Sequence, residues 1–112
     1  DHFLAETIAW LREQQRPTAL YYVSDHGDSL GEKGLYLHGM PYSMAPEEQT
    51  HVPMVFWSSG GWPQHTNLAF HCLRQRSTEP LSHDHLFHSV LGLAGVQTAA
   101  RQPALDLFRP CR

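Results

Sequence analysis

Tyr21-Tyr22-Val23-Ser24-Asp25-His26-Gly27 joins a strongly apolar segment directly to a carboxylate, an imidazole and a glycine. Adjacent side chains on a regular strand point to opposite faces, so Asp25 and His26 can bind one ion only if the chain leaves the strand there. Gly27 permits that departure, because a residue without a Cβ reaches backbone conformations that other residues avoid. The stretch therefore predicts a metal site at the end of a strand.

The residues around this stretch predict an α/β fold. Residues 18–24 are β-branched and aromatic without strict alternation, which is typical of a strand buried on both faces of a parallel sheet. A second strand is expected over 52–57. Helices are expected over about 1–15, 64–76 and 83–94, the last with Ser82 as its N-cap. Residues 27–50 lack sustained periodicity and are expected to form a long functional loop with at most a short helical turn.

Length and charge exclude some classes of function. The 112 residues, 41% of them hydrophobic, are compatible with one domain that has a core. The net charge is −3 and the basic residues are scattered, so no nucleic-acid partner is expected. No run approaches the roughly 20 apolar residues that span a bilayer. Because the chain opens at Asp1 on an already helical pattern, we expect a piece of a longer protein.

Asp25 and His26 offer an oxygen and an imidazole nitrogen, a mixed donor set that zinc accepts. Two ligands do not complete a site, and His38, in Tyr36-Leu37-His38-Gly39, is the best local candidate for a third. The alternative is that Asp25 and His26 make ordinary polar contacts or cap a helix. The position of the pair, at the end of a strand and before a glycine-bearing acidic loop, favours the metal site.

The remaining polar residues have simpler interpretations. Ser24 and Ser29 lack the setting of a nucleophile and are expected to make structural hydrogen bonds. His83, His85 and His88 do not share one helical face, so a joint metal site is not expected there. Cys72 and Cys111 are too far apart for a zinc knuckle, which leaves a long-range disulfide or two buried thiols. The aromatic residues Phe56, Trp57 and Trp62 are expected in the core.

Several segments together form the pattern of a known family. They are Tyr22-Val23-Ser24-Asp25-His26-Gly27-Asp28-Ser29-Leu30-Gly31-Glu32, Gly34-Leu35-Tyr36-Leu37-His38-Gly39, Gln49-Thr50-His51-Val52-Pro53-Met54, Ser82-His83-Asp84-His85-Leu86-Phe87-His88 and Asp106-Leu107-Phe108. With them the chain resembles the C-terminal part of the periplasmic catalytic domain of bacterial phosphoethanolamine transferases. That family includes lipid A modifying enzymes and mobile colistin-resistance enzymes, and belongs to the alkaline phosphatase and sulfatase superfamily.

The resemblance implies a fold and a place in a larger protein. The fold would be the C-terminal part of a sulfatase-like α/β/α sandwich with a mostly parallel central sheet. Residues 1–112 would form a C-terminal fragment of the catalytic domain, with the membrane-spanning domain and the nucleophilic Thr in earlier sequence. Such a fragment is expected to be inactive alone. The parent would be a monomer at the periplasmic face of the bacterial inner membrane, a compartment that favours the disulfide.

The resemblance also implies a reaction. Phosphoethanolamine would pass from phosphatidylethanolamine to lipid A or another lipopolysaccharide acceptor through a phosphothreonine intermediate, giving polymyxin resistance. Asp25 and His26 would bind zinc, and His38 would lie near the phosphoryl group or a second zinc. Asp28 stands where the family usually has Glu, so a supporting role is all that is carried over to it. The alternatives are another hydrolase or phosphoglycerol transferase of the superfamily, or a non-catalytic zinc-binding module.

Overall fold

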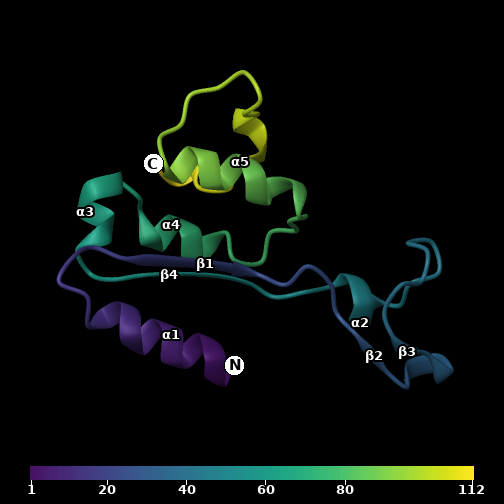
Figure 1. The fold of residues 1–112 in the computed structure, drawn as a ribbon. Coiled ribbons are helices and arrows are strands. Elements are labelled where there is room, and N and C mark those ends of the chain that lie inside the picture. The colour runs from purple at the N-terminus through teal and green to yellow at the C-terminus, as the bar shows by residue number, and fades with distance from the viewer. The chain divides into compact units, whose positions relative to one another are not determined.

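The computed structural model describes all residues, 1–112, and they divide into two compact units (Figure 1). The first unit comprises residues 1–13 and 19–57, and the second comprises 14–18 and 58–112. No helix in the structure is both long enough and apolar enough to cross a bilayer.

In the first unit, helix α1 (His2–Arg12) precedes strand β1 (Ala19–Val23), and strand β4 (Met54–Ser58) completes a two-stranded sheet with β1. The helix expected over 1–15 thus ends three residues early. Pro17 disfavours helical backbone at the residue before it, which is consistent with an end short of Arg16. The Arg12 guanidinium lies 5.8 Å from the centre of the Trp57 ring, so α1 packs on β4 through a cation–π contact.

The sheet differs from the expectation in two ways. Figure 1 shows β1 and β4 running in opposite directions, so the parallel pairing predicted for β1 is not made between these two strands. All five residues of β1 are partly exposed, so the strand is not buried on both faces in this structure. Side chains join the strands instead: Tyr21 meets Phe56 edge to face at 6.2 Å and donates its hydroxyl to Met54 Sδ at 3.2 Å.

The segment from 27 to 50 contains more structure than a loop. It includes strand β2 (Ser29–Leu30), the 3₁₀ turn η1 (Glu32–Gly34), strand β3 (Tyr36–Leu37) and helix α2 (Glu47–Thr50). Strands β2 and β3 form an antiparallel hairpin, whose turn needs positive φ angles at Gly31 and Gly34. Two-residue strands and a four-residue helix are too short to give a periodic pattern, and for this reason the sequence did not indicate them.

The second unit is built from short helices. They are α3 (Trp62–Thr66), α4 (Phe70–Gln75), α5 (Asp84–Leu93), η2 (Pro103–Leu105) and η3 (Arg109–Cys111). The single helix expected over 64–76 is wrong, because Asn67 adopts a left-handed backbone (φ 53°) that separates α3 from α4. Helix α5 matches the prediction for 83–94 closely, but its N-cap is His83 rather than Ser82, and His83 makes no side-chain capping bond.

The core of the second unit is small and partly polar. Leu68, Phe108 and Cys111 are buried, and so are the polar residues Ser89 and Asp106. Cys72 and Cys111 form a disulfide with Cα atoms 5.5 Å apart, which resolves the choice between disulfide and free thiols. The aromatic residues Phe56, Trp57 and Trp62, which were expected in the core, are partly buried in this chain.

Asp106 makes polar contacts with three residues of this unit. Its Oδ2 lies 2.6 Å from Arg101 Nη2 and 3.5 Å from Arg112 Nη1, and its Oδ1 accepts the Phe108 N–H at 3.0 Å. The carboxylate is completely buried and lies directly against Gly92 of α5. Two guanidinium groups and a backbone donor satisfy the buried charge. Asp106 therefore links residues of the C-terminal segment to one another where that segment packs against α5.

Candidate metal centre

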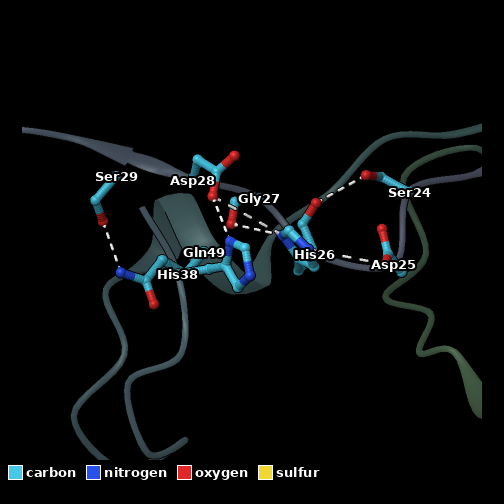
Figure 2. A network of polar contacts seen from close by, with 8 residues as sticks. All are labelled: Ser24, Asp25, His26, Gly27, Asp28, Ser29, His38 and Gln49. Atoms are coloured by element: carbon cyan, nitrogen blue, oxygen red, sulfur yellow. Dashed lines mark hydrogen bonds and ion pairs between the residues drawn. The ribbon is translucent and has the colours of Figure 1, made fainter. Parts of the chain in front are cut away.

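The site begins where β1 ends. The Ser24 hydroxyl donates to the backbone carbonyl of His26 at 2.7 Å, which turns the chain immediately after the strand (Figure 2). The turn brings the Asp25 carboxylate and the His26 ring to one place, as the sequence predicts for two adjacent residues that share an ion. The structural role expected for Ser24 is confirmed.

Gly27 is required for space rather than for an unusual φ angle. Its N–H donates to the backbone carbonyl of Gln49 at 3.0 Å, and a Cβ at this position would overlap the carbonyl of Glu48. Its φ angle is not in the left-handed region. The sequence therefore located the departure from the strand correctly but gave the wrong reason for the glycine. The glycine is needed because helix α2 approaches the backbone closely at this position.

The hairpin brings His38 back to the strand end. Ser29 pairs with Leu37 and Leu30 with Tyr36, and continuing this register by one position sets Asp28 opposite His38. Asp28 Oδ1 lies 2.7 Å from His38 Nδ1. Leu37, immediately before His38, has a φ of 62°, a costly conformation for a residue with a Cβ. His38 is therefore presented by a strained backbone within a specific strand register.

Each of the two imidazole rings has an acceptor oxygen beside its Nδ1 atom. His26 Nδ1 lies 3.2 Å from the Gly27 carbonyl oxygen, which can only accept, so this contact favours a proton on Nδ1. The carboxylate of Asp28 does the same for His38. The two rings stack with centroids 3.7 Å apart and planes tilted by 31°. With the proton on Nδ1, a neutral ring offers its Nε2 lone pair to a metal.

The arrangement contains two carboxylates and two imidazoles. His26, Asp28 and His38 each offer a ligand atom within 4.8 Å of the others, and they are the one such group of three in the chain. Asp25 is 90% exposed and lies outside that group, yet its Oδ2 is 3.8 Å from His26 Nε2. The structure thus brings His26 and His38 together with Asp28, and places Asp25 beside His26. Oxygen and imidazole nitrogen donors at this spacing fit a zinc ion.

Glu32, in the turn of the hairpin, carries a shifted pKa. Backbone N–H groups of Glu32 itself, Leu30 and Gly31 bond its carboxylate, and the Leu30 bond measures 2.6 Å. These bonds favour the charged form and hold the pKa of Glu32 below its ordinary value of 4.5. The acid belongs to the hairpin turn rather than to the ligand group.

The other histidines do not join the centre. His51 is 79% exposed and pairs only with Glu47 at 3.2 Å, which confirms a surface role. His85 contacts Ser82, while the buried His88 accepts the N–H of Gln102 at 3.0 Å. The expectation that His83, His85 and His88 do not form a joint metal site is confirmed.

Sequence reasoning missed Gln49. This residue is buried on α2, and its side-chain amide donates to the Ser29 hydroxyl at 2.9 Å. Nothing in local spacing connects residue 49 with residue 29, and the only available signal was the Gln49-Thr50-His51-Val52-Pro53-Met54 segment of the family resemblance. Ser29 itself makes the structural hydrogen bond that was expected of it.

Comparisons with known proteins agree with this fold. The sulfatase family profile matches residues 1–96. The chain is 48% identical to the phosphoethanolamine transferase EptA of Salmonella typhimurium. The match covers all of this chain and 21% of that relative. It therefore spans about a fifth of the length of this curated relative.

Two solved structures match the fold. The soluble domain of lipooligosaccharide phosphoethanolamine transferase A from Neisseria meningitidis superposes with a TM-score of 0.93 at 42% identity, over 99% of this chain and 34% of that one. The C-terminal periplasmic domain of phosphoethanolamine transferase EptC from Campylobacter jejuni superposes with a TM-score of 0.83 at 42% identity. That match covers 97% of this chain and 34% of the EptC chain. These matches confirm the sulfatase-like α/β fold class.

The profile match covers most of the chain, and the relatives that match it share both the fold and close sequence identity. The chain therefore belongs to the sulfatase family, in which its relatives are phosphoethanolamine transferases.

Proposed function

We propose that this chain supplies part of the metal and phosphoryl site of a zinc-dependent phosphoethanolamine transferase. The donor is phosphatidylethanolamine, and the acceptor is lipid A or another lipopolysaccharide group. The parent protein is a monomer at the periplasmic face of the inner membrane, with residues 1–112 as a C-terminal fragment of its catalytic domain. The observation that carries the proposal is the convergence of Asp25, His26 and His38 at one strand end, in a chain with transferase relatives.

Each residue has a separate task. Asp25 and His26 would hold the ion, because Asp25 Oδ2 and His26 Nε2 lie 3.8 Å apart. The Asp25 carboxylate would offset the charge of the ion, and the His26 imidazole would supply a nitrogen ligand. A bound zinc would stabilise negative charge on the phosphoryl oxygens and lower the pKa of a coordinated hydroxyl.

His38 faces the transferred group. Its Nδ1 proton is bonded by Asp28, so the Nε2 atom is left to contact a phosphoryl oxygen or a second ion. Asp28 has a shorter side chain than the Glu that is usual in the family, and the 2.7 Å contact supports its expected supporting role. The threonine that would accept phosphoethanolamine is expected in the earlier sequence of the parent protein, so catalysis requires the full chain.

The test uses the full-length parent protein in phospholipid vesicles, with labelled phosphatidylethanolamine as donor and lipid A as acceptor. Mass spectrometry follows transfer to lipid A, and elemental analysis measures zinc. We expect one or more zinc ions per chain, and a loss of transfer on chelation that zinc restores. Asp25→Ala and His26→Ala should each reduce kcat by about 100-fold or more, because the metal contributes several kcal/mol to transition-state stabilisation.

His51→Ala is the matched control, since this histidine is exposed and pairs only with Glu47. It should leave transfer unchanged. In cells, the wild-type gene should raise polymyxin resistance and the His26→Ala gene should not. Hydrolysis of the donor without any acceptor product would favour the alternative of a superfamily hydrolase. Zinc binding with no turnover of any phosphoester or sulfate ester would favour a non-catalytic zinc module.

A further inference from the structure

Gln49 contacts the site segment on both sides of Asp28. Its backbone carbonyl accepts the Gly27 N–H at 3.0 Å. Its side-chain amide donates to the Ser29 hydroxyl at 2.9 Å (Figure 2). Residues 27 and 29 are the immediate neighbours of Asp28 in the chain. One residue of α2 therefore fixes both ends of the three-residue segment whose middle side chain bonds His38.

The contact is buried although the ligands are exposed. Ser29 is 1% exposed and Gln49 is 6% exposed, whereas about half of the Asp28 side chain is open to solvent. A hydrogen bond in a water-free position is costly to lose, because its partner is left unsatisfied. The buried pair can therefore keep the backbone in place while the Asp28 carboxylate stays accessible.

Ser29 is also one of the paired residues of the β2–β3 hairpin. It pairs with Leu37 in the β2–β3 hairpin, and this pairing sets Asp28 opposite His38. The ladder has only two pairs of residues, and a slip by one position would turn each side chain to the other face. So short a ladder specifies its register weakly by itself. The hydrogen bond from Gln49 to Ser29 comes from outside the hairpin and holds β2 in this register.

We infer that Gln49 is a positioning residue: through Gly27 and Ser29 it fixes Asp28 against His38 and so aligns both imidazoles for the metal and the phosphoryl group. The inference rests on the proposed function for its catalytic consequence. The positioning of Asp28 by Gln49 does not depend on the proposed function, because zinc affinity measures that positioning without any turnover.

The experiment compares Gln49→Leu and Ser29→Ala in the full-length protein. Each removes the bond between the two side chains but keeps the Gln49 backbone carbonyl that accepts from Gly27. We expect zinc affinity, measured by competition with a chromogenic chelator, to fall by about 10- to 100-fold, as for other groups that orient metal ligands. We expect kcat to fall by a similar factor with little change in KM.

Ser89→Ala is the matched control. Ser89 is fully buried and its hydroxyl accepts the Leu107 N–H at 3.0 Å, so it loses the same kind of bond in the other unit. It should lower the unfolding temperature and leave zinc affinity and kcat unchanged. If Ser89→Ala lowers zinc affinity as much as Ser29→Ala does, the effect is general destabilisation and the inference is wrong.

A double-mutant cycle separates positioning from structure. If Gln49 acts through Asp28, Gln49→Leu should change zinc affinity less than about 2-fold when Asp28 is already Ala. An undiminished effect in that background would overturn the inference. A wild-type protein that binds zinc but transfers nothing would refute the proposed function alone, and the affinity cycle would still decide on Gln49. A wild-type protein that binds no zinc would overturn both.

Discussion

Asp28 and Asp106 are two carboxylates of one chain in opposite circumstances. Asp106 is completely buried, with two arginines and a backbone N–H as partners. Asp28 is about half exposed and has one short contact, to His38. A carboxylate whose bonding capacity is used up by its own chain contributes stability, while one that keeps an open oxygen can serve a ligand. Asp106 therefore stabilises the second unit, while Asp28 remains accessible within the proposed site.

The largest expected effect on stability belongs to the disulfide. Replacing Cys72 and Cys111 by Ser opens a loop with a sequence separation of 39 residues. The chain-entropy model gives a loss of about 3–4 kcal/mol in the free energy of unfolding. Urea unfolding with and without reductant measures it. If the wild-type and double-serine proteins unfold at the same urea concentration without reductant, the cross-link contributes nothing.

Next comes the direct comparison of the two carboxylates. Asp106→Ala leaves Arg101 and Arg112 without their common partner and should cost about 3 kcal/mol of stability. Asp28→Ala should cost less than about 1 kcal/mol, because its contact is exposed. Transfer activity should show the reverse order, with Asp28→Ala reducing kcat by about 10- to 100-fold. Equal stability losses in the two variants would invalidate the distinction between them.

Gly27 beside Asp28 and Gly92 beside Asp106 allow the same comparison, with a smaller expected loss of stability. An alanine Cβ would overlap the Glu48 carbonyl at position 27 and the Asp106 carboxylate at position 92. Each substitution should destabilise by about 1–3 kcal/mol, the usual range for overpacking. Gly27→Ala should also weaken zinc binding, because α2 must move away from the site. Gly92→Ala should leave zinc binding unchanged when the variant is measured below its unfolding temperature.

The smallest effect concerns pH. Because its pKa is lowered in the fold, Glu32 contributes stability that is present above its ordinary value of 4.5 and is lost as the pH falls through the lowered value. Carbon NMR of the Glu32 carboxyl should give a midpoint below 4.5, and Glu32→Gln should remove this part of the acid dependence. A midpoint at or above 4.5 would show that the backbone bonds do not persist in solution.

The sequence could indicate the site wherever the information was local. A strand that ends in Asp25-His26-Gly27 carries its own signal, since the change from apolar to ligand residues occurs within a few positions. The contact between Asp28 and His38 depends on the register of two-residue strands, which leave no periodic trace. The bond between Ser29 and Gln49 joins residues 20 positions apart. Such contacts follow only from the folded backbone.

The fold shows the same division. Helix α5 was predictable because ten residues repeat an apolar face. The break between α3 and α4 was not, because it depends on the backbone of one residue, Asn67. Cysteine spacing alone left two possibilities, and the structure decided between them. The direction of β1 relative to β4 depends on the chain path between the strands, about which the side-chain pattern of either strand says nothing.

Leu37 shows that an exposed position can be intolerant of change. About two thirds of this residue is open to solvent, which would ordinarily permit almost any side chain. Its left-handed backbone reverses that expectation. Gly and Asn adopt this conformation readily, while Val, Ile and Thr do so at the greatest cost. A saturation screen of position 37 should therefore rank amino acids by backbone preference rather than by hydrophobicity, and would reveal the hairpin conformation from sequence variation alone.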